Sequence, residues 1–389
     1  MIVRKAFKFR LKTNHKAEYE LAKMAAASRF LWNKSLILNL DRLRNKQKIM
    51  WYQELNFWTN IWKKSEEYGF LKECHSQVLQ QKLKDLDKAF KDAFDKTQPN
   101  KRIPKFKKKG IDDGFRYPQG FKVNNDQVYL PNIGWLRFLK SRNIVGIPKN
   151  VTISRHAGKW YVSIQTEYEV EQPVHESTKI VGIDLGVTRF ATLSNKTFYK
   201  PKNSFKKLER KLKLAQRKRD RKVKFSNNWK KQNQRINKIH TKIANVRNDY
   251  LHWVSTRISK NHAMIVMEDL KIKNMSASAK CDMENPGRNV KAKSGLNKAI
   301  LDQGWGEFRR QLEYKQAWRG GQLIIVNPKF TSQTCSKCDH VCADSRLSQS
   351  EFKCVACGFE IHADFNGALN VLRAGHAQLA CGDIKQVDA

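Results

Sequence analysis

Two cysteine knuckles near the C-terminus constrain this chain more than any other feature. Cys335 and Cys338 are followed by Cys354 and Cys357 in a C-x₂-C-x₁₅-C-x₂-C pattern. Knuckles at this separation can supply four thiolates to one tetrahedral Zn²⁺ ion. Residues 1–12 alternate apolar and basic side chains and lack the continuous apolar stretch of a signal peptide, so we expect a cytoplasmic protein with reduced thiols. The pattern therefore predicts a structural zinc module and disfavours disulfides.

The remaining cysteines, Cys74, Cys281, Cys342 and Cys381, show no such spacing and are predicted to be isolated thiols. Cys342 lies within the loop between the knuckles, where it could compete for zinc, although the C-x-x-C geometry favours the other four. No apolar run approaches the length of a membrane span.

The net charge predicts a polyanionic partner. Lys and Arg number 76 against 36 Asp and Glu, which gives +40 on 389 residues. A solvated lysine coat would normally carry compensating acids, so DNA or RNA is the favoured partner, bound in a salt-sensitive and largely sequence-independent way. Hydrophobic residues make up 40% of the chain and there are 10 tryptophans, enough to build cores in two or three domains.

The first half of the chain predicts a small β-barrel interrupted by helices. Residues 7–11 alternate like a half-buried strand, whereas residues 18–45 and 76–94 have helical periodicity, with an apolar stripe in the second helix: Leu79, Leu83, Leu86 and Phe90. Short alternating strands separated by Gly, Pro and Asn fill residues 115–169 and are typical of a small barrel. The N-terminal strand would join this barrel, and the helices would then be an insertion.

Two basic segments could contact nucleic acid. Residues 101–110 include Lys105, Lys107 and Lys108. The sequence of this segment is equally consistent with a linker and with an extended strand that follows a phosphate backbone. Residues 200–247 hold 19 Lys and Arg against 2 acids and predict one or two long basic helices. A merely solvated face of this composition would repel itself, so we expect nucleic-acid contacts there, with Arg217, Arg219 and Arg221 as candidates.

Three acids stand at the ends of otherwise apolar elements. Asp184 ends a β-branched strand between Gly182 and Gly186, which would allow close approach of a backbone or a phosphate. Glu268 lies at the acidic end of the strand predicted at residues 263–270, and Asp364 begins the helix at 364–373. One such acid alone is more often a cap or an ion-pair partner. Three of them in a strongly basic chain predict two-metal phosphodiester hydrolysis, with Mg²⁺ or Mn²⁺ held by carboxylate oxygens.

These motifs together give the chain a close resemblance to the TnpB family, the RNA-guided nucleases of insertion sequences and relatives of type V CRISPR effectors. The resemblance spans nearly the whole chain and is carried by the following segments: residues 5–11, Arg29 to Asn33, Pro104 to Lys108, residues 130–134, Gly182 to Gly186, residues 268–270 and 304–308, the knuckles, and Asp364 to Asn370.

The resemblance implies a multidomain α+β fold. It implies a wedge-like barrel over residues 1–12 and 115–175, with a helical recognition domain inserted at 13–114. An RNase H-like, RuvC-type nuclease domain would comprise 176–330 and 358–389, including basic helices at 200–260, and would carry a zinc ribbon at 331–357. Asp184, Glu268 and Asp364 would be its catalytic acids, with Asp184 bridging two metal ions.

The implied activity is RNA-guided cleavage of double-stranded DNA. A guide RNA derived from the transposon end would direct a monomer, in the cytoplasm beside the nucleoid, to a target next to a short DNA motif. Two alternatives stay open: an RNase H-like transposase or integrase that needs no RNA, and an RNA-guided repressor. Repressors of this kind lose acids, and this chain retains all three.

Two positions depart from the family pattern. Ala363 stands where many members carry an arginine before the third acid, and Asp339 stands where a glycine often follows the second cysteine. Neither is a predicted ligand, but the first could alter substrate placement near the metal ions.

Overall fold

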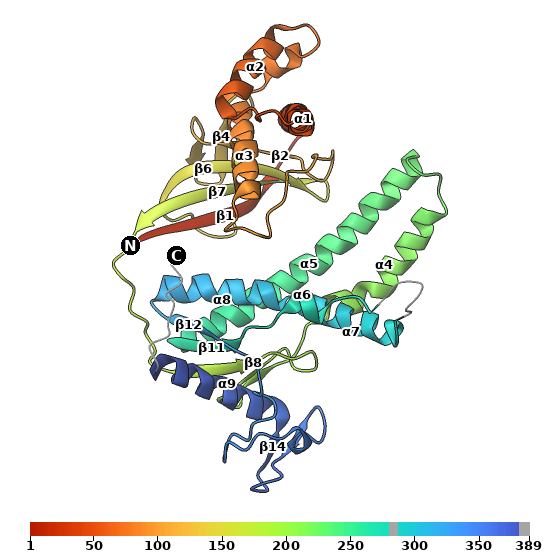
Figure 1. The fold of residues 1–389 in the computed structure, drawn as a ribbon. Helices are drawn as coiled ribbons and strands as arrows, with labels where there is room; N and C mark the ends of the chain where they lie inside the picture. Colours follow the sequence, from red (N-terminus) through yellow and green to blue (C-terminus); the bar gives the residue numbers. More distant parts are fainter. Residues whose placement is uncertain (280–286, 381–389) are drawn as a thin grey trace. The chain divides into compact units, whose positions relative to one another are not determined.

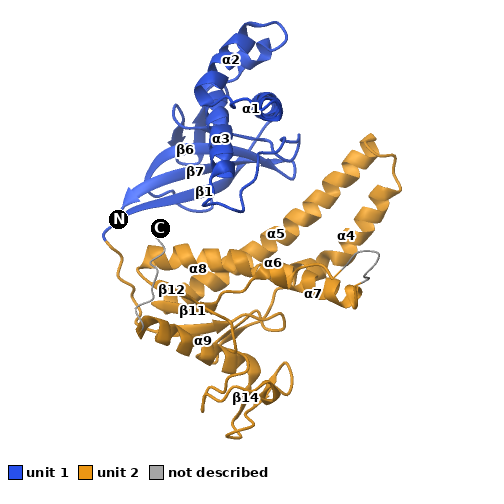
Figure 2. Cartoon of the chain, in the orientation of Figure 1, with its two compact units in different colours: residues 1–171 blue, residues 172–389 orange. Residues whose placement is uncertain are grey.

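The computed structural model describes residues 1–279 and 287–380, so Cys281 and Cys381 lie outside the described residues. The chain forms two compact units, residues 1–171 and 172–389 (Figure 2). Among the described residues, no helix has both the length and the apolarity needed to cross a membrane.

Unit 1 is built on a seven-stranded antiparallel sheet in the order β2-β6-β7-β1-β5-β4-β3. Its strands are β1 (Ile2–Lys12), β2 (Gly114–Tyr117), β3 (Lys122–Asn124), β4 (Gln127–Leu130), β5 (Gly134–Phe138), β6 (Ile147–His156) and β7 (Lys159–Glu169). β1 pairs with β7 over nine residues and with β5 through Leu11 and Lys12, so the predicted joining of the N-terminal strand is confirmed. The strand pairs leave β2 and β3 at the two edges, and the closed barrel expected from the sequence is not confirmed.

The helices of unit 1 are α1 (His15–Arg44), α2 (Tyr52–Lys64), the 3₁₀ turn η1 (Gly69–Glu73) and α3 (Ser76–Phe94). The stripe predicted on α3 is buried and packs in one core with α1 and the sheet. Helix α2 was not predicted, because it exposes Phe57, Trp58 and Ile61 opposite its few buried residues and so lacks a single apolar face.

Unit 2 contains a five-stranded sheet in the order β10-β9-β8-β11-β12. The strands are β8 (Ile180–Asp184), β9 (Ala191–Leu193), β10 (Phe198–Tyr199), β11 (Met264–Glu268) and β12 (Gln322–Val326). β8, β9 and β10 form an antiparallel meander, and β11 runs parallel to both β8 and β12. The sheet is therefore a three-stranded antiparallel meander extended on one side by two parallel strands.

Helices cover both faces of this sheet (Figure 1). The helices of unit 2 are α4 (Ser204–Asp220), α5 (Asn227–Asn261), α6 (Ile272–Met275), α7 (Val290–Gln303), α8 (Trp305–Arg319) and α9 (Ala363–Ala380), and α4 packs on α5 rather than on the sheet. Ile265 and Met267 of β11 pack against α5 and α8, whereas Val266 between them packs against α9. Alternate side chains of a strand point to opposite faces, so α9 lies on the other side of the sheet from α5 and α8.

A small module lies in the chain between β12 and α9. It contains the 3₁₀ turn η2 (Ala343–Ser345) and a hairpin of β13 (Glu351–Lys353) with β14 (Glu360–His362). The hairpin leads directly into α9, so the module is tied to the helix that begins with the third predicted acid.

Candidate metal sites and nucleic-acid contacts

The structure brings Asp184, Glu268 and Asp364 to one cavity of about 670 Å³. Asp184 ends β8 and Glu268 ends β11, and these strands are parallel neighbours in register, so their carboxyl ends meet at one edge of the sheet. Asp364 lies in the first turn of α9, which packs across β8. Acids that are 84 and 96 residues apart in sequence therefore surround the same space.

The close packing of α9 on β8 depends on glycine. A Cβ atom at Gly182 would lie 2.3 Å from the carbonyl oxygen of Ala368 and 2.7 Å from the amide nitrogen of Leu372. A Cβ atom at Gly367, on α9, would lie 3.3 Å from Asp184 Oδ2. Gly182 thus permits the close backbone approach predicted from the sequence, and the approach places Asp184 beside the first turns of α9.

The carboxylates are in an environment that disfavours their negative charge. Burial, and then the carboxylates of Glu268 and Asp364, raise the pKa of Asp184 to about 8, although Arg346 opposes this shift. Part of the Asp184 surface still faces the cavity. Burial also raises the pKa of Glu268, against the effect of a hydrogen bond from Thr331. Crowded acids of this kind are stabilised as anions by bound cations.

The donor set fits hard divalent cations. Carboxylate oxygens are the ligands that Mg²⁺ and Mn²⁺ prefer, and two-metal sites hold their ions about 3.5–4 Å apart.

Two residues beside the acids were not found from the sequence. Thr331 Oγ1 donates a hydrogen bond to Glu268 Oε1 at 2.5 Å, and Arg346, from the module, lines the same cavity. Thr331 lies four residues before the first knuckle, but no sequence pattern connects it to Glu268. Arg346 reaches the acids only through the placement of the module.

The alanine before the third acid lies between the zinc module and the cavity. Ala363 is buried in a small core with Cys335, Phe352 and Cys354, and it also lines the cavity that holds the three acids. The cation close enough to affect Asp184 is Arg346.

The four knuckle cysteines meet as predicted. The Sγ atoms of Cys335 and Cys357 are 3.8 Å apart, and those of Cys338 and Cys354 are 3.6 Å apart. Four thiolates about 2.3 Å from a tetrahedral Zn²⁺ have sulfur atoms about 3.8 Å from one another, so the site fits zinc. Cys342 does not belong to this group, and its Sγ atom lies 4.0 Å from Asp344.

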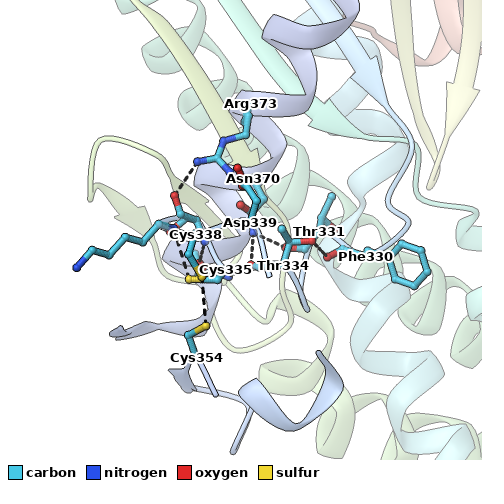
Figure 3. Close-up of polar contacts among 12 residues, drawn as sticks. Phe330, Thr331, Thr334, Cys335, Cys338, Asp339, Cys354, Asn370 and Arg373 are labelled. Carbon is cyan, nitrogen blue, oxygen red and sulfur yellow. Dashed lines mark hydrogen bonds and ion pairs between the residues drawn. The ribbon is translucent and has the colours of Figure 1, made fainter. Parts of the chain in front are cut away.

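Polar side chains of α9 fasten the zinc module to the helix (Figure 3). Asn370 Nδ2 donates to the carbonyls of Thr331, at 2.9 Å, and Thr334, at 2.7 Å. Arg373 pairs with Asp339, whose backbone is left-handed with φ of 62°. That conformation explains why glycine suits the position, and the ion pair gives the aspartate a structural role.

The basic segment at 101–110 is held on α1. The amide of Lys107 donates to Asn33 Oδ1 at 2.8 Å, and Asn33 Nδ2 donates to the carbonyl of Lys107 at 3.0 Å. Trp32 Nε1 donates to the carbonyl of Lys105 at 3.1 Å. Lys107 Nζ lies 3.9 Å from the centroid of the Trp32 ring, whereas Lys105 and Lys108 are exposed. Lys107 therefore stabilises the segment, and its two neighbours remain accessible to phosphates.

The basic region at 200–247 forms two helices, α4 and α5, joined at residues 221–226. Arg217 and Arg221 are exposed, and Arg219 pairs with Asp220 at 2.7 Å. The helical interpretation is confirmed, while the nucleic-acid contacts stay a prediction.

The sheet and the acids at its edge define a protein of the RNase H-like, RuvC-type nuclease fold. Family models match residues 163–279 ("Probable transposase"), 305–371 ("Cas12f1-like, TNB domain") and 1–48 ("Helix-turn-helix domain"). Residues 1–48 form β1 and the single helix α1 in this structure.

Relatives match over almost the full chain. "Putative RNA-guided DNA endonuclease InsQ" of Escherichia coli is 52% identical, covering 98% of this chain and 94% of its own. A "Putative RNA-guided DNA endonuclease" of Streptomyces pristinaespiralis is 34% identical, covering 98% and 92%. The chain belongs to the TnpB family, the OrfB-type proteins of insertion sequences.

A solved structure shares the fold. The protein in "Cryo-EM structure of the Cas12f1-sgRNA-target DNA complex" matches with a TM-score of 0.53 at 14% identity, covering 95% of this chain and 99% of that one.

Proposed function

We propose that this protein is an RNA-guided DNA endonuclease that cleaves double-stranded DNA by metal-dependent hydrolysis. The observation that carries the proposal is the meeting of Asp184, Glu268 and Asp364 in one cavity of an RNase H-like sheet, within a chain of charge +40. The names of the relatives point to the same activity. The guide is an RNA derived from the transposon end, and the target lies beside a short DNA motif, in the compartment that holds the chromosome.

Asp184, Glu268 and Asp364 would hold the divalent cations through their carboxylate oxygens. Bound Mg²⁺ or Mn²⁺ supplies an activated water and stabilises the leaving oxygen. The chain contributes the positions of the ligands: Gly182 lets β8 meet α9, and the Thr331 hydrogen bond fixes the orientation of Glu268. Arg346 adds a positive charge that helps keep Asp184 ionised.

The remaining parts of the chain position the nucleic acids. Residues 1–12 and 115–175 form the wedge barrel, 13–114 the recognition domain, 176–330 and 358–389 the nuclease domain, and 331–357 the zinc ribbon. Phosphates contact Lys105, Lys108, Arg217, Arg219 and Arg221, and one protein molecule binds one RNA.

The test begins with purification of the protein together with its native nucleic acid. We expect one discrete RNA from the neighbouring element, and cleavage of matching DNA that requires both this RNA and Mg²⁺. Asp184→Asn, Glu268→Gln and Asp364→Asn should each abolish cleavage and leave RNA binding intact. Asp269→Asn is the matched control, because this acid adjoins Glu268 but pairs with Arg309 at 2.8 Å.

Cleavage by any of the three variants would refute the assignment of that residue. RNA-independent joining of transposon ends would replace the proposed activity with that of a transposase. RNA-guided binding without any cleavage would indicate a repressor.

A further inference from the structure

The helical hairpin of α4 and α5 combines a strong positive charge with exposed apolar surface. Between residues 200 and 247 there are 19 basic residues and 2 acids, Glu209 and Asp220. At the tip that joins the helices, Val223 is 79% exposed and Phe225 is 64% exposed. Large apolar side chains are usually buried away from water, so an exposed group of them among cations indicates a binding surface.

The tip presents an aromatic pair among cations. The ring centroids of Phe225 and Trp229 are 5.4 Å apart with an interplanar angle of 59°, and Lys224 Nζ lies 5.2 Å from the centre of the Phe225 ring. Phe225 has a backbone φ of 68°, a left-handed conformation that is rare for a bulky residue. Such conformations cluster at functional sites, since they persist only where the surrounding structure imposes them.

A groove between the helices has the same character. It has a volume of about 520 Å³ and is lined by Leu208, Leu214 and Ile239 together with five cations, Lys218 and Arg235 among them, and its described lining contains no acid. Leu214 is 48% exposed. A ligand that suits this surface has flat apolar faces and repeated negative charges, as an unpaired strand of nucleic acid has.

The hairpin is rigid enough to act as a platform. Gln232 Nε2 donates to the carbonyl of Ala215 at 2.9 Å, in a buried contact between the two helices. At the base of α4, the Asp302 carboxylate accepts bonds from Ser204 Oγ and from the amide of Phe205, at 2.9 and 3.0 Å.

We propose that the α4–α5 hairpin binds an unpaired stretch of the guide RNA, with a base stacked on Phe225 and Trp229 and adjoining nucleotides in the groove. The inference rests on the proposed function in naming the guide as the source of the strand. We favour RNA over DNA because the guide RNA is bound both before and after the protein meets its target. It can therefore neutralise the mutually repelling basic residues of α4 and α5 at every stage.

The test uses the full chain, freed of nucleic acid at high salt, and a 12-nucleotide oligouridylate that carries one 5-iodouridine. Ultraviolet irradiation should crosslink the probe to the peptide at residues 223–229. Phe225→Gly should weaken binding of the oligouridylate about tenfold, because a base–aromatic stack is lost, and should leave the slope of log K against log salt unchanged. Phe225→Trp should retain binding.

Two controls separate stacking from folding and from charge. Glycine is comfortable at φ of 68°, so Phe225→Gly should melt no lower than the wild type. Lys218→Gln should instead reduce the salt slope by about 0.7, as expected for one lost contact to a single-stranded phosphate.

The inference is overturned if Phe225→Gly binds the oligouridylate like the wild type, or loses the same factor on a 12-base-pair RNA duplex. A loss confined to 12-nucleotide oligothymidylate would assign the site to DNA and overturn the RNA assignment. If no guide RNA co-purifies but Phe225→Gly still weakens binding of the oligouridylate, the proposed guided nuclease activity is refuted and the stacking site is not. Guided cleavage with no Phe225→Gly effect on the oligouridylate would refute the stacking site alone.

Discussion

Thr331 connects Glu268 to the zinc module through both its side chain and its backbone. Its hydroxyl donates to Glu268 Oε1 at 2.5 Å, and its carbonyl accepts from Asn370 Nδ2, the same amide that holds the carbonyl of Thr334 directly before Cys335. One short stretch of chain therefore positions a candidate metal ligand at one end and enters the first knuckle at the other.

Loss of the Thr331 hydroxyl should weaken the candidate Mg²⁺ site. We expect Thr331→Val to reduce Mn²⁺ affinity about 10- to 100-fold, the usual effect of removing a partner that orients a metal ligand. Titration calorimetry with Mn²⁺ measures the change, and the zinc content should stay the same. Thr331→Ser should restore affinity, and Thr334→Val, which removes a hydroxyl bonded to the Phe330 carbonyl, should have no effect. Equal Mn²⁺ affinity in the valine variant and the wild type would contradict the positioning role.

Asp184→Asn should raise the melting temperature of the metal-free protein by a few degrees. The substitution removes a carboxyl group whose ionisation is disfavoured in the folded protein by burial and by the Glu268 and Asp364 carboxylates. Added Mg²⁺ should stabilise the wild type against heat and leave the variant unchanged. Differential scanning fluorimetry with and without Mg²⁺ checks both statements, and an equal Mg²⁺ effect on the two proteins would argue against metal binding at Asp184.

Cys354→Ser should release zinc. Cys354 is buried, and its Sγ atom lies 3.6 Å from that of Cys338. A three-thiolate site of this kind binds zinc more weakly, and the module should become sensitive to proteases because metal binding contributes to its folding. Elemental analysis and limited proteolysis provide the measurements. Cys342→Ser is the control and should keep its zinc, and retention by both variants would refute the site.

Gly182→Ala should destabilise unit 2 by more than about 2 kcal/mol, because the new Cβ would lie 2.3 Å from a backbone carbonyl of α9 that cannot move independently of the helix. Gly295→Ala, within α7, is the matched control, since nothing lies within 4 Å of its Cβ. It should stabilise the protein by about 0.5–1 kcal/mol through helix propensity. Chemical denaturation monitored by hydrogen exchange in β8 distinguishes the two, and similar stabilities would contradict the tight packing of β8 on α9.

Lys82 should make the stability of unit 1 depend on alkaline pH. Burial lowers the pKa of Lys82 to about 8, and its Nζ atom donates to the Gly114 carbonyl at 3.2 Å. The unfolded chain, with a lysine pKa near 10.5, then binds more protons than the folded chain between pH 8 and 10.5, so this residue's contribution to stability rises with pH across that window. Relative to Lys82→Met, the wild type should gain on the order of 3 kcal/mol in free energy of unfolding over this range. A difference that does not change with pH would show that Lys82 is not desolvated.

The parts of the fold that could be predicted from the sequence are those whose pattern is local. The apolar stripe of α3 repeats at helical spacing, and the apolar run that ends at Asp184 is typical of a central strand. The spacing of the four cysteines is itself enough to predict the zinc module. Helix α2 escaped prediction because Phe57, Trp58 and Ile61 are apolar yet exposed, and they obscure the buried face that Leu55, Thr59 and Trp62 form.

The residues around the acids depend on tertiary placement. Arg346 follows η2 and Thr331 follows β12, and neither lies near Asp184 or Glu268 in sequence. Their contribution to the cavity is decided by how α9 holds the module, through contacts such as that between Arg373 and Asp339. A local sequence pattern gives no information about such contacts. The three acids could be predicted because each lies at the end of a strand or helix that has a local pattern.

The position of Asp364 on α9 has a consequence for the timing of synthesis. β8 and β11 emerge from the ribosome well before α9. The third carboxylate joins the cavity only after the zinc module and then α9 have been synthesised and α9 has packed on Gly182. Translation at about 5–20 residues per second separates the second acid from the third by roughly 5–20 seconds. A nascent or prematurely terminated chain that ends before α9 therefore lacks one of the three acids. Under the proposed function, such a chain cannot cleave the chromosome that encodes it.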